Sequence, residues 1–170
     1  MGKSMAGHLQ KQGHKLMVFN RTASKADDLV KAGAEFMAPQ EIAKQADYLF
    51  MMLGYPHDVE KMVLDKEVGI LQHMKPGATL IDHTTSSPSL AIDIAEAAKD
   101  SGVHSVDAPV SGGDTGAQLG KLVTMVGGTQ EGFNGTKDLL EVYSQDVQLM
   151  GGPGAGQHTK AANQMMIALN

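Results

Sequence analysis

The sequence predicts an α/β domain built around a largely parallel β-sheet, because short apolar segments alternate with segments of helical periodicity. Six segments are predicted as strands: residues 15–19, 47–53, 78–84, 104–110, 121–128 and 146–150. Parallel strands need long crossover connections, and right-handed crossovers wind helices onto both faces of a sheet. Ligands of such sheets bind beyond the carboxyl ends of the strands, so we expect a functional site at that edge.

The strand predictions depend on apolar runs and on the turns beside them. KLMVF (15–19) is a compact apolar run that follows Gly13. DYLFMML (47–53) is nearly continuous in apolar residues, as expected for a strand buried on both faces. The turn signal Pro76-Gly77 leads into ATLIDHT (78–84).

The helix predictions depend on apolar spacing and on residues that begin or end helices. Helices are predicted over residues 1–13, 24–33, 87–102 and 130–144. Ser24 is expected to cap the second of these, which ends at Gly33. Pro88 suits the first turn of the third, and Gly102 ends it.

Composition narrows the class of function. A chain of 170 residues suits one domain or slightly more, and its net charge of -5 gives no support for nucleic-acid or membrane binding. The absence of cysteine excludes disulfides, thiolate metal sites and cysteine nucleophiles. The histidines show no ligand spacing, so no metal site is predicted. No apolar run approaches the roughly 20 residues of a membrane span. The absence of cysteine is compatible with a reducing compartment, and the predicted location is cytoplasmic.

The beginning of the chain differs from that of a dinucleotide-binding domain. Such a domain opens with a strand, a glycine-rich turn and a helix, whereas this chain opens with the predicted helix. Gly2 fits the last glycine of a G-x-G-x-x-G turn whose earlier part would precede Met1. The alternative is an α/β fold that starts with a helix. The later motifs favour a Rossmann-like doubly wound sheet that lacks its first strand.

The segment VFNRTASKA (18–26) follows the first predicted strand. In a dinucleotide-binding fold an acidic residue near this place selects NAD, whereas an arginine accommodates the 2′-phosphate of NADP. Here Asn20, Arg21 and Thr22 occupy the segment, and no acid is present. Arginine can bind a phosphate in bidentate fashion, so the motif favours NADP over NAD. The alternative is an ordinary polar turn with a solvated arginine.

Hydroxyl side chains gather in DHTTSSPSLA (82–91), between a predicted strand and a predicted helix. Such hydroxyls can orient a nicotinamide or a substrate at the edge of the sheet. Helix capping is the alternative, and it explains Ser87 just before Pro88. Capping does not account for Thr85.

A glycine-rich loop lies in DAPVSGGDTGA (107–117). Gly112 and Gly113 expose backbone N–H groups beside the Ser111 hydroxyl, and successive free N–H groups form a nest for an anion such as a carboxylate. The alternative is a loop that serves only as a turn.

The closing segment GPGAGQHTKAANQ (152–164) contains Lys160 and, three residues later on the same helical face, Asn163. A lysine inside a closed site can exchange a proton, and a neighbouring amide can hold a substrate hydroxyl or orient the ammonium. The alternative is a solvated surface lysine.

These four motifs, in this order, resemble the β-hydroxyacid dehydrogenase family, which includes 3-hydroxyisobutyrate dehydrogenase, tartronate semialdehyde reductase and glyoxylate or succinic semialdehyde reductase. The resemblance covers essentially the whole chain. It implies hydride transfer between a nicotinamide cofactor, with NADP favoured and NAD possible, and a small carboxylate-bearing substrate. That substrate would be a 3-hydroxy acid, a semialdehyde or a 2-oxo acid.

The resemblance also implies roles for single residues. Lys160 matches the catalytic general acid and base, Asn163 a substrate contact, and Thr85 a position near the nicotinamide ribose. The substrate carboxylate would bind at Ser111, Gly112 and Gly113. The cofactor would contact Gly2, Asn20, Arg21, Thr22, Met52 and Leu53.

The same resemblance divides the chain. Residues 1–152 would form a dinucleotide-binding domain truncated at its N-terminus. Residues 153–170 would begin an all-helical second domain that closes the site and makes the full-length parent a homo-oligomer. Gly154 and Gly156 are then interpreted as a hinge into the interdomain helix rather than as a phosphate cradle.

Two departures and one alternative qualify these expectations. Gly54 stands where several family members have proline or serine. The related 6-phosphogluconate dehydrogenases carry K-x-x-H-N where this chain has KAANQ (160–164), which argues against a sugar-phosphate substrate. The alternative function is an inactive nucleotide-binding fragment or scaffold remnant of such an enzyme.

Overall fold

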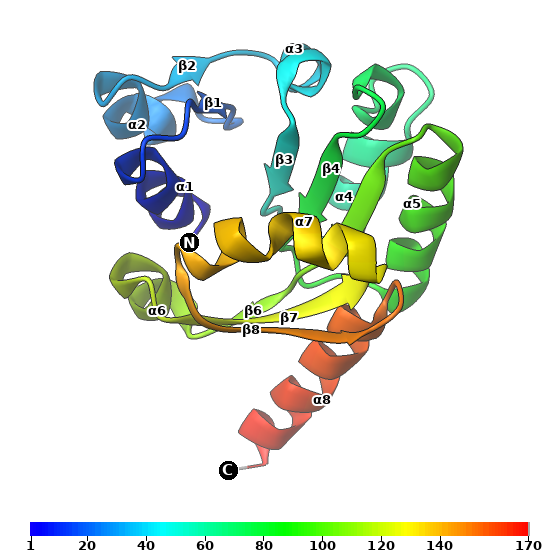
Figure 1. Ribbon diagram of the computed structural model, residues 1–170. Helices are drawn as coiled ribbons and strands as arrows, with labels where there is room; N and C mark the ends of the chain where they lie inside the picture. The colour runs from blue at the N-terminus through cyan, green and yellow to red at the C-terminus, as the bar shows by residue number, and fades with distance from the viewer. Residues whose placement is uncertain (170) are drawn as a thin grey trace.

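A six-stranded sheet forms the centre of the computed structural model, which describes residues 1–169 (Figure 1). Its strands are β3 (Tyr48–Met51), β4 (Thr79–Asp82), β5 (His104–Asp107), β6 (Val110–Ser111), β7 (Leu122–Gly128) and β8 (Ser144–Gly151). They lie in the order β3-β4-β5-β7-β6, and β8 pairs with β7. The pairs β3–β4, β4–β5 and β7–β8 are parallel, whereas β7 runs antiparallel to β5 and β6. The predicted α/β class with a mostly parallel sheet is confirmed.

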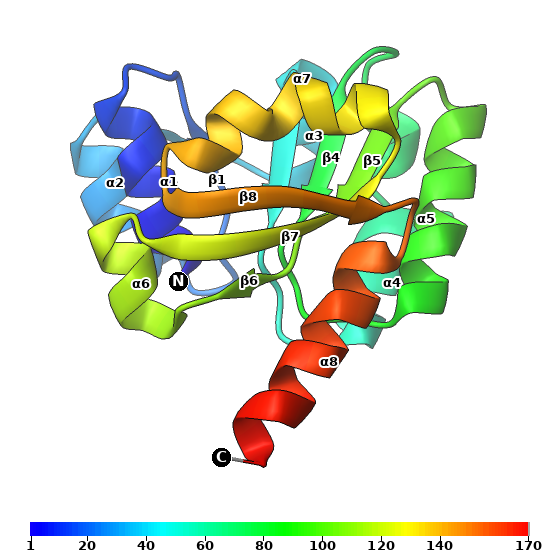
Figure 2. The same cartoon turned by 60° about the horizontal axis from the view of Figure 1, so that its bottom comes forward.

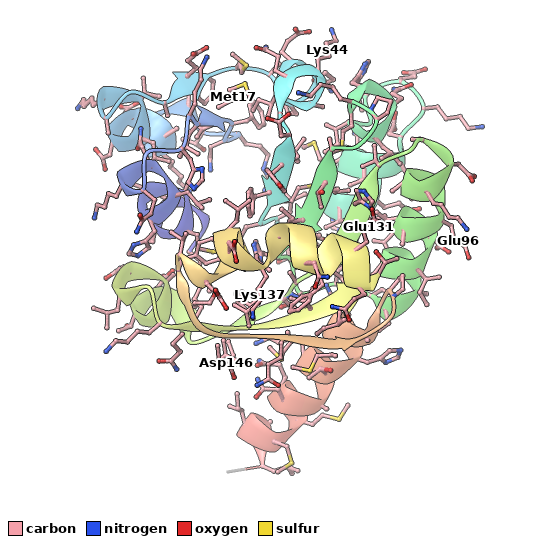
Figure 3. All side chains as sticks on the ribbon, in the orientation of Figure 1. Met17, Lys44, Glu96, Glu131, Lys137 and Asp146 are labelled. Atoms are coloured by element: carbon pink, nitrogen blue, oxygen red, sulfur yellow. The ribbon has the colours of Figure 1, made fainter. Side chains whose placement is uncertain are left out.

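Helices cover both faces of this sheet, and each face has its own apolar core. One core contains side chains of α3 (Pro39–Gln45), α4 (Pro56–Leu64) and α5 (Pro88–Asp100). The other contains side chains of α1 (Gly2–Lys11), α6 (Gly113–Leu119) and α7 (Gln130–Glu141). Residues of β3 alternate between the two cores, because successive side chains of a strand point to opposite faces. Charged residues such as Glu96 on α5 and Lys137 on α7 lie on the solvent side (Figure 3).

A second, two-stranded sheet stands apart from the central one (Figure 1). It consists of β1 (Met17–Val18) and β2 (Glu35–Phe36), which pair in parallel. The connection between them is a 3₁₀ turn, η1 (Ala23–Ala26), followed by α2 (Asp27–Lys31). Within residues 1–169, no strand pairs with both β1 and β3, so the two sheets are not joined by hydrogen bonds between strands.

Several sequence predictions need correction. The predicted strand 15–19 forms a ladder only at two residues, and the predicted helix 24–33 begins as a 3₁₀ turn, so Ser24 lies inside that turn and does not cap α2. The predicted strand 104–110 is divided into β5 and β6, because Pro109 lies between them and has no N–H to donate. The capping role of Ser87 is confirmed, since its hydroxyl accepts a hydrogen bond from the Leu90 N–H over 3.5 Å.

Four elements have no counterpart among the predictions: β2, α3, α4 and α6. Two of these helices begin at a proline, Pro39 in α3 and Pro56 in α4, which is a helix-start signal that the sequence does carry. The short 3₁₀ turn η2 (Leu71–His73) follows α4.

The last helix, α8 (Ala155–Ala168), packs its first half against β7 and β8 and then leaves the body of the molecule (Figures 1 and 2). Its outer half exposes Met165, Ile167 and Leu169 to solvent. The predicted second segment, 153–170, is therefore described up to residue 169, and Asn170 lies outside the described residues. None of the described helices has the length and hydropathy to cross a membrane.

Candidate active site

Two buried aspartates mark the carboxyl ends of the central strands. Asp82 is the last residue of β4, and burial raises the pKa of its carboxyl to about 6. Its Oδ1 accepts a hydrogen bond from the Thr84 N–H over 2.9 Å. Asp107 ends the neighbouring strand β5, and burial raises the pKa of this carboxyl as well. The carboxyl edge of the sheet is thus a polar site with little access to water.

Asp107 fixes the start of α8. Its Oδ1 accepts a hydrogen bond from the Gly154 N–H over 2.8 Å, and its Oδ2 accepts one from the Gln157 N–H over 2.9 Å. The first N–H groups of a helix have no partner within the helix, so a carboxylate placed there stabilises the helix start. Asp107 therefore sets the position of every side chain in the first turns of α8.

Glycines allow this close approach of α8 to the sheet. A Cβ atom on Gly156 would lie 2.5 Å from the Met125 carbonyl oxygen and 2.8 Å from Asp107 Oδ2. Gly154 has a φ of +84°, which favours glycine. The interpretation of these two glycines as a hinge stays a prediction; in this structure the hydrogen bonds and the tight packing hold the segment against β5 and β7.

Gln157 connects α8 to the loop that follows β4. Its Nε2 donates to the Thr84 carbonyl over 2.7 Å, and its Oε1 accepts from the Ser86 N–H over 2.8 Å. Thr84 Oγ1 in turn accepts from the Leu53 N–H over 2.9 Å, so the ends of β3 and β4 are tied together. Thr85 is exposed at this edge. Among residues 1–169, Ser86 Oγ is a buried oxygen without a hydrogen-bond partner.

Lys160 lies one turn further along α8 and is only 7% exposed. The interpretation as a solvated surface lysine is therefore wrong. Its Nζ donates to Gln164 Oε1 over 2.8 Å, and no ion pair of Lys160 is found in the described part of the chain. Burial lowers the pKa of the ammonium, because the charged form loses its hydration.

Asn163 connects this helix to the glycine-rich loop. Its Nδ2 donates to Ser111 Oγ in a long hydrogen bond of 3.4 Å and lies equally far from Gln164 Oε1. Gly112 and Gly113 follow Ser111 with φ values of +122° and +62°, and both are exposed. The structure thus brings Lys160, Asn163 and the Ser111 loop to one site.

The residues predicted to contact a cofactor gather at the neighbouring part of the edge. A Cβ atom on Gly2, at the start of α1, would lie 3.4 Å from Met52 Cβ, just beyond the end of β3. Arg21, which follows β1, reaches Asp58 near the start of α4, with 3.9 Å between Nη1 and Oδ1. The carboxyl ends of β1 and β3 therefore lie on the same side of the molecule.

The turn after β1 is held by its own side chains. Asn20 Oδ1 accepts a hydrogen bond from the Thr22 N–H over 2.9 Å, which is an Asx turn. The Asn20 side chain is thus occupied by the turn, whereas the Arg21 side chain is 84% exposed and available to a ligand. At position 54, a Cβ would lie 3.3 Å from Asp58 Oδ2, so the glycine leaves room for that carboxylate.

Sequence reasoning missed Asp107, Gln157 and Gln164 as parts of the site. Asp107 had a usable signal, because an acid that ends an apolar strand has to find a partner. Gln164 had one too, since it lies four residues after Lys160 and therefore on the same face of the helix. Gln157 had none, because its partners Thr84 and Ser86 are 73 and 71 residues away.

The fold and the polar carboxyl edge of its central sheet together define a class of protein. A mostly parallel sheet covered by helices on both faces, with a helix N-terminus and polar loops at the carboxyl ends of its strands, is the architecture of a Rossmann-like dinucleotide-binding domain. Residues 1–152 match the family described as the NAD binding domain of 6-phosphogluconate dehydrogenase, and the chain belongs to that family of oxidoreductases.

Three known proteins show how close the similarity is. An uncharacterized oxidoreductase, YkwC of Bacillus subtilis (strain 168), is 46% identical over 169 residues, which is 99% of this chain and 58% of that protein. A Mycobacterium tuberculosis 3-hydroxyisobutyrate dehydrogenase, solved with L-serine, matches with a TM-score of 0.92 and 30% identity over 99% of this chain and 57% of its own. A third structure, Psf3 in complex with NADP+ and 2-OPP, has a TM-score of 0.92 and 29% identity over 98% of this chain and 59% of its own.

These matches confirm the resemblance to hydroxyacid dehydrogenases that the sequence motifs indicate. They also show that the chain spans somewhat more than half the length of the relatives it matches.

Proposed function

We propose that this chain is the cofactor-binding part of an enzyme that transfers hydride between a nicotinamide cofactor and a small carboxylate-bearing hydroxy acid. The observation that carries the proposal is the buried Lys160, whose ammonium has no ion pair among residues 1–169 and lies beside Asn163 and Ser111 at the carboxyl edge of the sheet. The 3-hydroxyisobutyrate dehydrogenase among the similar structures supports a 3-hydroxy acid or its semialdehyde as the substrate, with a 2-oxo acid as a further possibility.

The proton step follows from the environment of Lys160. Reduction of a carbonyl group needs a proton at the oxygen, and the best donor has a pKa near the working pH. Burial moves the pKa of Lys160 in that direction. The amide oxygen of Gln164 orients the ammonium without neutralising it, since an amide carries no charge. In the reverse direction, the neutral amine accepts the proton of the hydroxyl group.

The residues at the neighbouring edge fit a dinucleotide. The N-terminus of α1 presents free N–H groups, and Gly2 leaves room beside Met52 for a phosphate to approach. The unpartnered Ser86 hydroxyl and the exposed Thr85 offer polar contacts on the nicotinamide side. The nicotinamide supplies the hydride chemistry when it is bound.

The exposed Arg21 favours NADP, and the NADP+ complex among the similar structures supports that choice. NAD stays an alternative, because the family itself is named for NAD.

The substrate carboxylate is proposed to bind at Ser111, Gly112 and Gly113. Both glycines have positive φ and are exposed, which suits a nest of backbone N–H groups for an anion. The hydrogen bond from Asn163 orients the Ser111 hydroxyl, which leaves its own proton for the carboxylate. An aldehyde or ketone next to that carboxylate would then lie within reach of Lys160.

We also propose that residues 153–170 belong to a second, helical domain in a longer, homo-oligomeric and cytoplasmic protein, with 1–152 as the cofactor domain. The outer half of α8 supports this, because Met165, Ile167 and Leu169 are exposed to solvent. The same exposure favours a second candidate function, in which the chain by itself binds nucleotide without turnover.

Absorbance at 340 nm with NADPH and a panel of short semialdehyde and 2-oxo acids tests the catalytic role. We expect Lys160→Met to lower turnover by about 10²-fold or more, the usual contribution of a general acid, with the NADPH dissociation constant unchanged within about twofold. Lys137→Met, on the exposed face of α7, is the matched control. Equal turnover in both variants would contradict the role, and NADPH binding without any wild-type turnover would favour the second candidate.

A further inference from the structure

The turn after β1, residues 19–26, contains no acidic residue, but the fold places one beside it from another element. Asp58 lies in the first turn of α4, and its Oδ1 is 3.9 Å from Arg21 Nη1. Arg21 is the residue that favours the 2′-phosphate of NADP in the proposed function. A carboxylate therefore stands next to the group that would choose between the two cofactors.

The position of Asp58 is set by the chain that leads into α4. Tyr55 is extended and Pro56 begins the helix, so the Asp58 N–H donates to the Tyr55 carbonyl over 3.0 Å. Gly54 leaves room for the carboxylate, since a Cβ there would lie 3.3 Å from Asp58 Oδ2. The Asp58 side chain is 25% exposed and that of Arg21 is 84% exposed. The acid is thus the sheltered partner, and the arginine extends into solvent.

The Asp58 carboxylate keeps the capacity to accept a hydrogen bond. Besides Arg21, its neighbour is His57, whose Nε2 lies 3.8 Å from Oδ1 and whose ring stacks on Tyr55. Neither distance is short enough for a hydrogen bond, so among residues 1–169 these two neighbours leave the lone pairs of the carboxylate free. A hydroxyl donor of a ligand at this place would therefore find an acceptor.

A 2′-phosphate bound to Arg21 would meet the charge of Asp58. Phosphate oxygens that pair with a guanidinium lie about 2.8 Å from its nitrogens. The phosphate and the carboxylate would then share one guanidinium and lie roughly 8 Å apart, which is close to the Debye length at physiological ionic strength. Like charges at this distance repel each other, so Asp58 should weaken NADP binding relative to a site with Arg21 alone.

NAD carries a hydroxyl group at the 2′ position instead of the phosphate. In dinucleotide-binding folds, an acidic side chain accepts a hydrogen bond from this hydroxyl. Asp58 can supply the same acceptor from α4, because the carboxyl ends of β1 and β3 lie on one side of the molecule and α4 begins there. The acid therefore affects the two cofactors in opposite directions.

We infer that Asp58 is a specificity-determining residue that opposes the 2′-phosphate of NADP and accepts a hydrogen bond from the 2′-hydroxyl of NAD. Arg21 and Asp58 act against each other, so the preference for NADP is smaller than Arg21 alone would give. This role rests on the proposed function, because it requires a dinucleotide at the carboxyl edge of the sheet.

Titrations of NADPH and NADH against the full chain, followed by nicotinamide fluorescence, test this role. Asp58→Asn removes the charge but keeps an oxygen that accepts, so we expect the NADPH dissociation constant to fall about fivefold and that of NADH to change by less than about twofold. Asp58→Ala also removes the acceptor, and it should in addition weaken NADH binding about fivefold.

Glu60→Gln is the matched control. Glu60 is exposed on α4 two residues after Asp58, and residues two apart do not share a face of a helix. The substitution removes the same charge from the same helix, and it should leave both dissociation constants unchanged.

Salt separates opposition between charges from a structural role. The gain in NADPH affinity of Asp58→Asn over the wild type should shrink towards onefold as NaCl rises from about 20 mM to about 500 mM, because salt screens the repulsion. An acid that only stabilises the first turn of α4 would give no gain to be screened.

The outcomes distinguish this role from the proposed function. Saturable binding of both cofactors with an unchanged ratio in Asp58→Asn, or an equal shift of both, would overturn the role of Asp58 and leave the proposed function standing. The same gain in Glu60→Gln would assign the effect to net charge and would also overturn it. No saturable binding of either cofactor to the wild type would contradict the proposed function, and the role of Asp58 with it.

Discussion

At the scale of single residues, burial decides which side chains can act in the site. The sequence places Lys160 three residues before Asn163, but only the structure shows that Lys160 is buried, at 7% exposure, and that its Nζ donates to Gln164. The prediction of Lys160, Asn163 and Ser111 as neighbours from spacing and motif is consistent with their arrangement in the structure. Gln157 escaped prediction because its partners Thr84 and Ser86 are far away in sequence.

The pKa of Lys160 gives a first prediction. The carbon and proton resonances next to Nζ, assigned by comparison with Lys160→Met, report the titration of this amine. We expect a midpoint below the ordinary 10.5, because burial disfavours the charged form. A midpoint at or above the ordinary value would show that the ammonium is well solvated.

The specificity for NADP gives a second prediction, at Arg21. Arg21→Gln should weaken NADPH binding about tenfold and leave NADH binding unchanged, because a charge-assisted hydrogen bond contributes about 1.5–3 kcal/mol. Lys44→Gln, on the exposed surface of α3, is the matched control. If both cofactors weaken together, Arg21 does not contact the 2′-phosphate.

A third prediction concerns the buried His83, whose ring packs against Phe50 and Tyr143. Its Nδ1–H donates to the Ala108 carbonyl over 2.6 Å, so in the neutral ring Nε2 accepts from the Tyr143 hydroxyl over 2.8 Å. Burial lowers the pKa of His83 from 6.5 to about 4. The unfolded chain thus takes up a proton before the native state does as the pH falls.

The neutral His83 therefore contributes stability that is complete above pH 6.5 and is lost as the pH falls from there to about 4. Compared with His83→Gln, the wild type should lose about 2–3 kcal/mol more of its free energy of unfolding between pH 7 and pH 4.5. Urea unfolding at the two values measures this. Asp82, whose raised pKa acts in the opposite direction, is present in both proteins and cancels. Parallel pH profiles would contradict the assignment.

At the scale of elements, the sequence predicts strands better than it predicts their partners. The apolar runs at 47–53, 78–84 and 121–128 became β3, β4 and β7, because buried strands have a distinct composition. The exposed β2 has no such signal, since both of its residues face solvent. Its pairing with β1 depends on the fold around it.

The attachment of α8 gives a fourth prediction. Gly156→Ala should lower the free energy of unfolding by about 2 kcal/mol or more, because the new methyl group would lie 2.5 Å from the Met125 carbonyl oxygen. Gly152→Ala is the matched control, since a Cβ there meets nothing within 4 Å, and it should change stability by less than about 0.5 kcal/mol. Thermal or urea unfolding compares the two. Equal stabilities would mean that α8 is not clamped to the sheet.

At the scale of the whole molecule, the class of fold could be predicted, because alternation of strands and helices leaves few arrangements. The predicted mostly parallel sheet is confirmed, but β1 and β2 stand apart from it as a two-stranded sheet. The sequence could not show that the apolar side chains form two separate cores, since that depends on which face of the sheet each helix covers. Nor could it predict how closely Gly156 packs against Met125 and Asp107, which are distant in sequence.

The central claim is that the carboxyl edge of the sheet binds a nicotinamide dinucleotide, with Gly2 at the phosphates. Titration of NADPH and NADH against the chain, followed by nicotinamide fluorescence, tests it most directly, because the chain contains no tryptophan to interfere. We expect saturable binding that Gly2→Val weakens at least tenfold, since its added methyl groups would crowd Met52 and the phosphate site. Gly135→Val, at an open position of α7, should bind as the wild type does. No saturable signal with either cofactor, or equal affinity of the two variants, would contradict the claim.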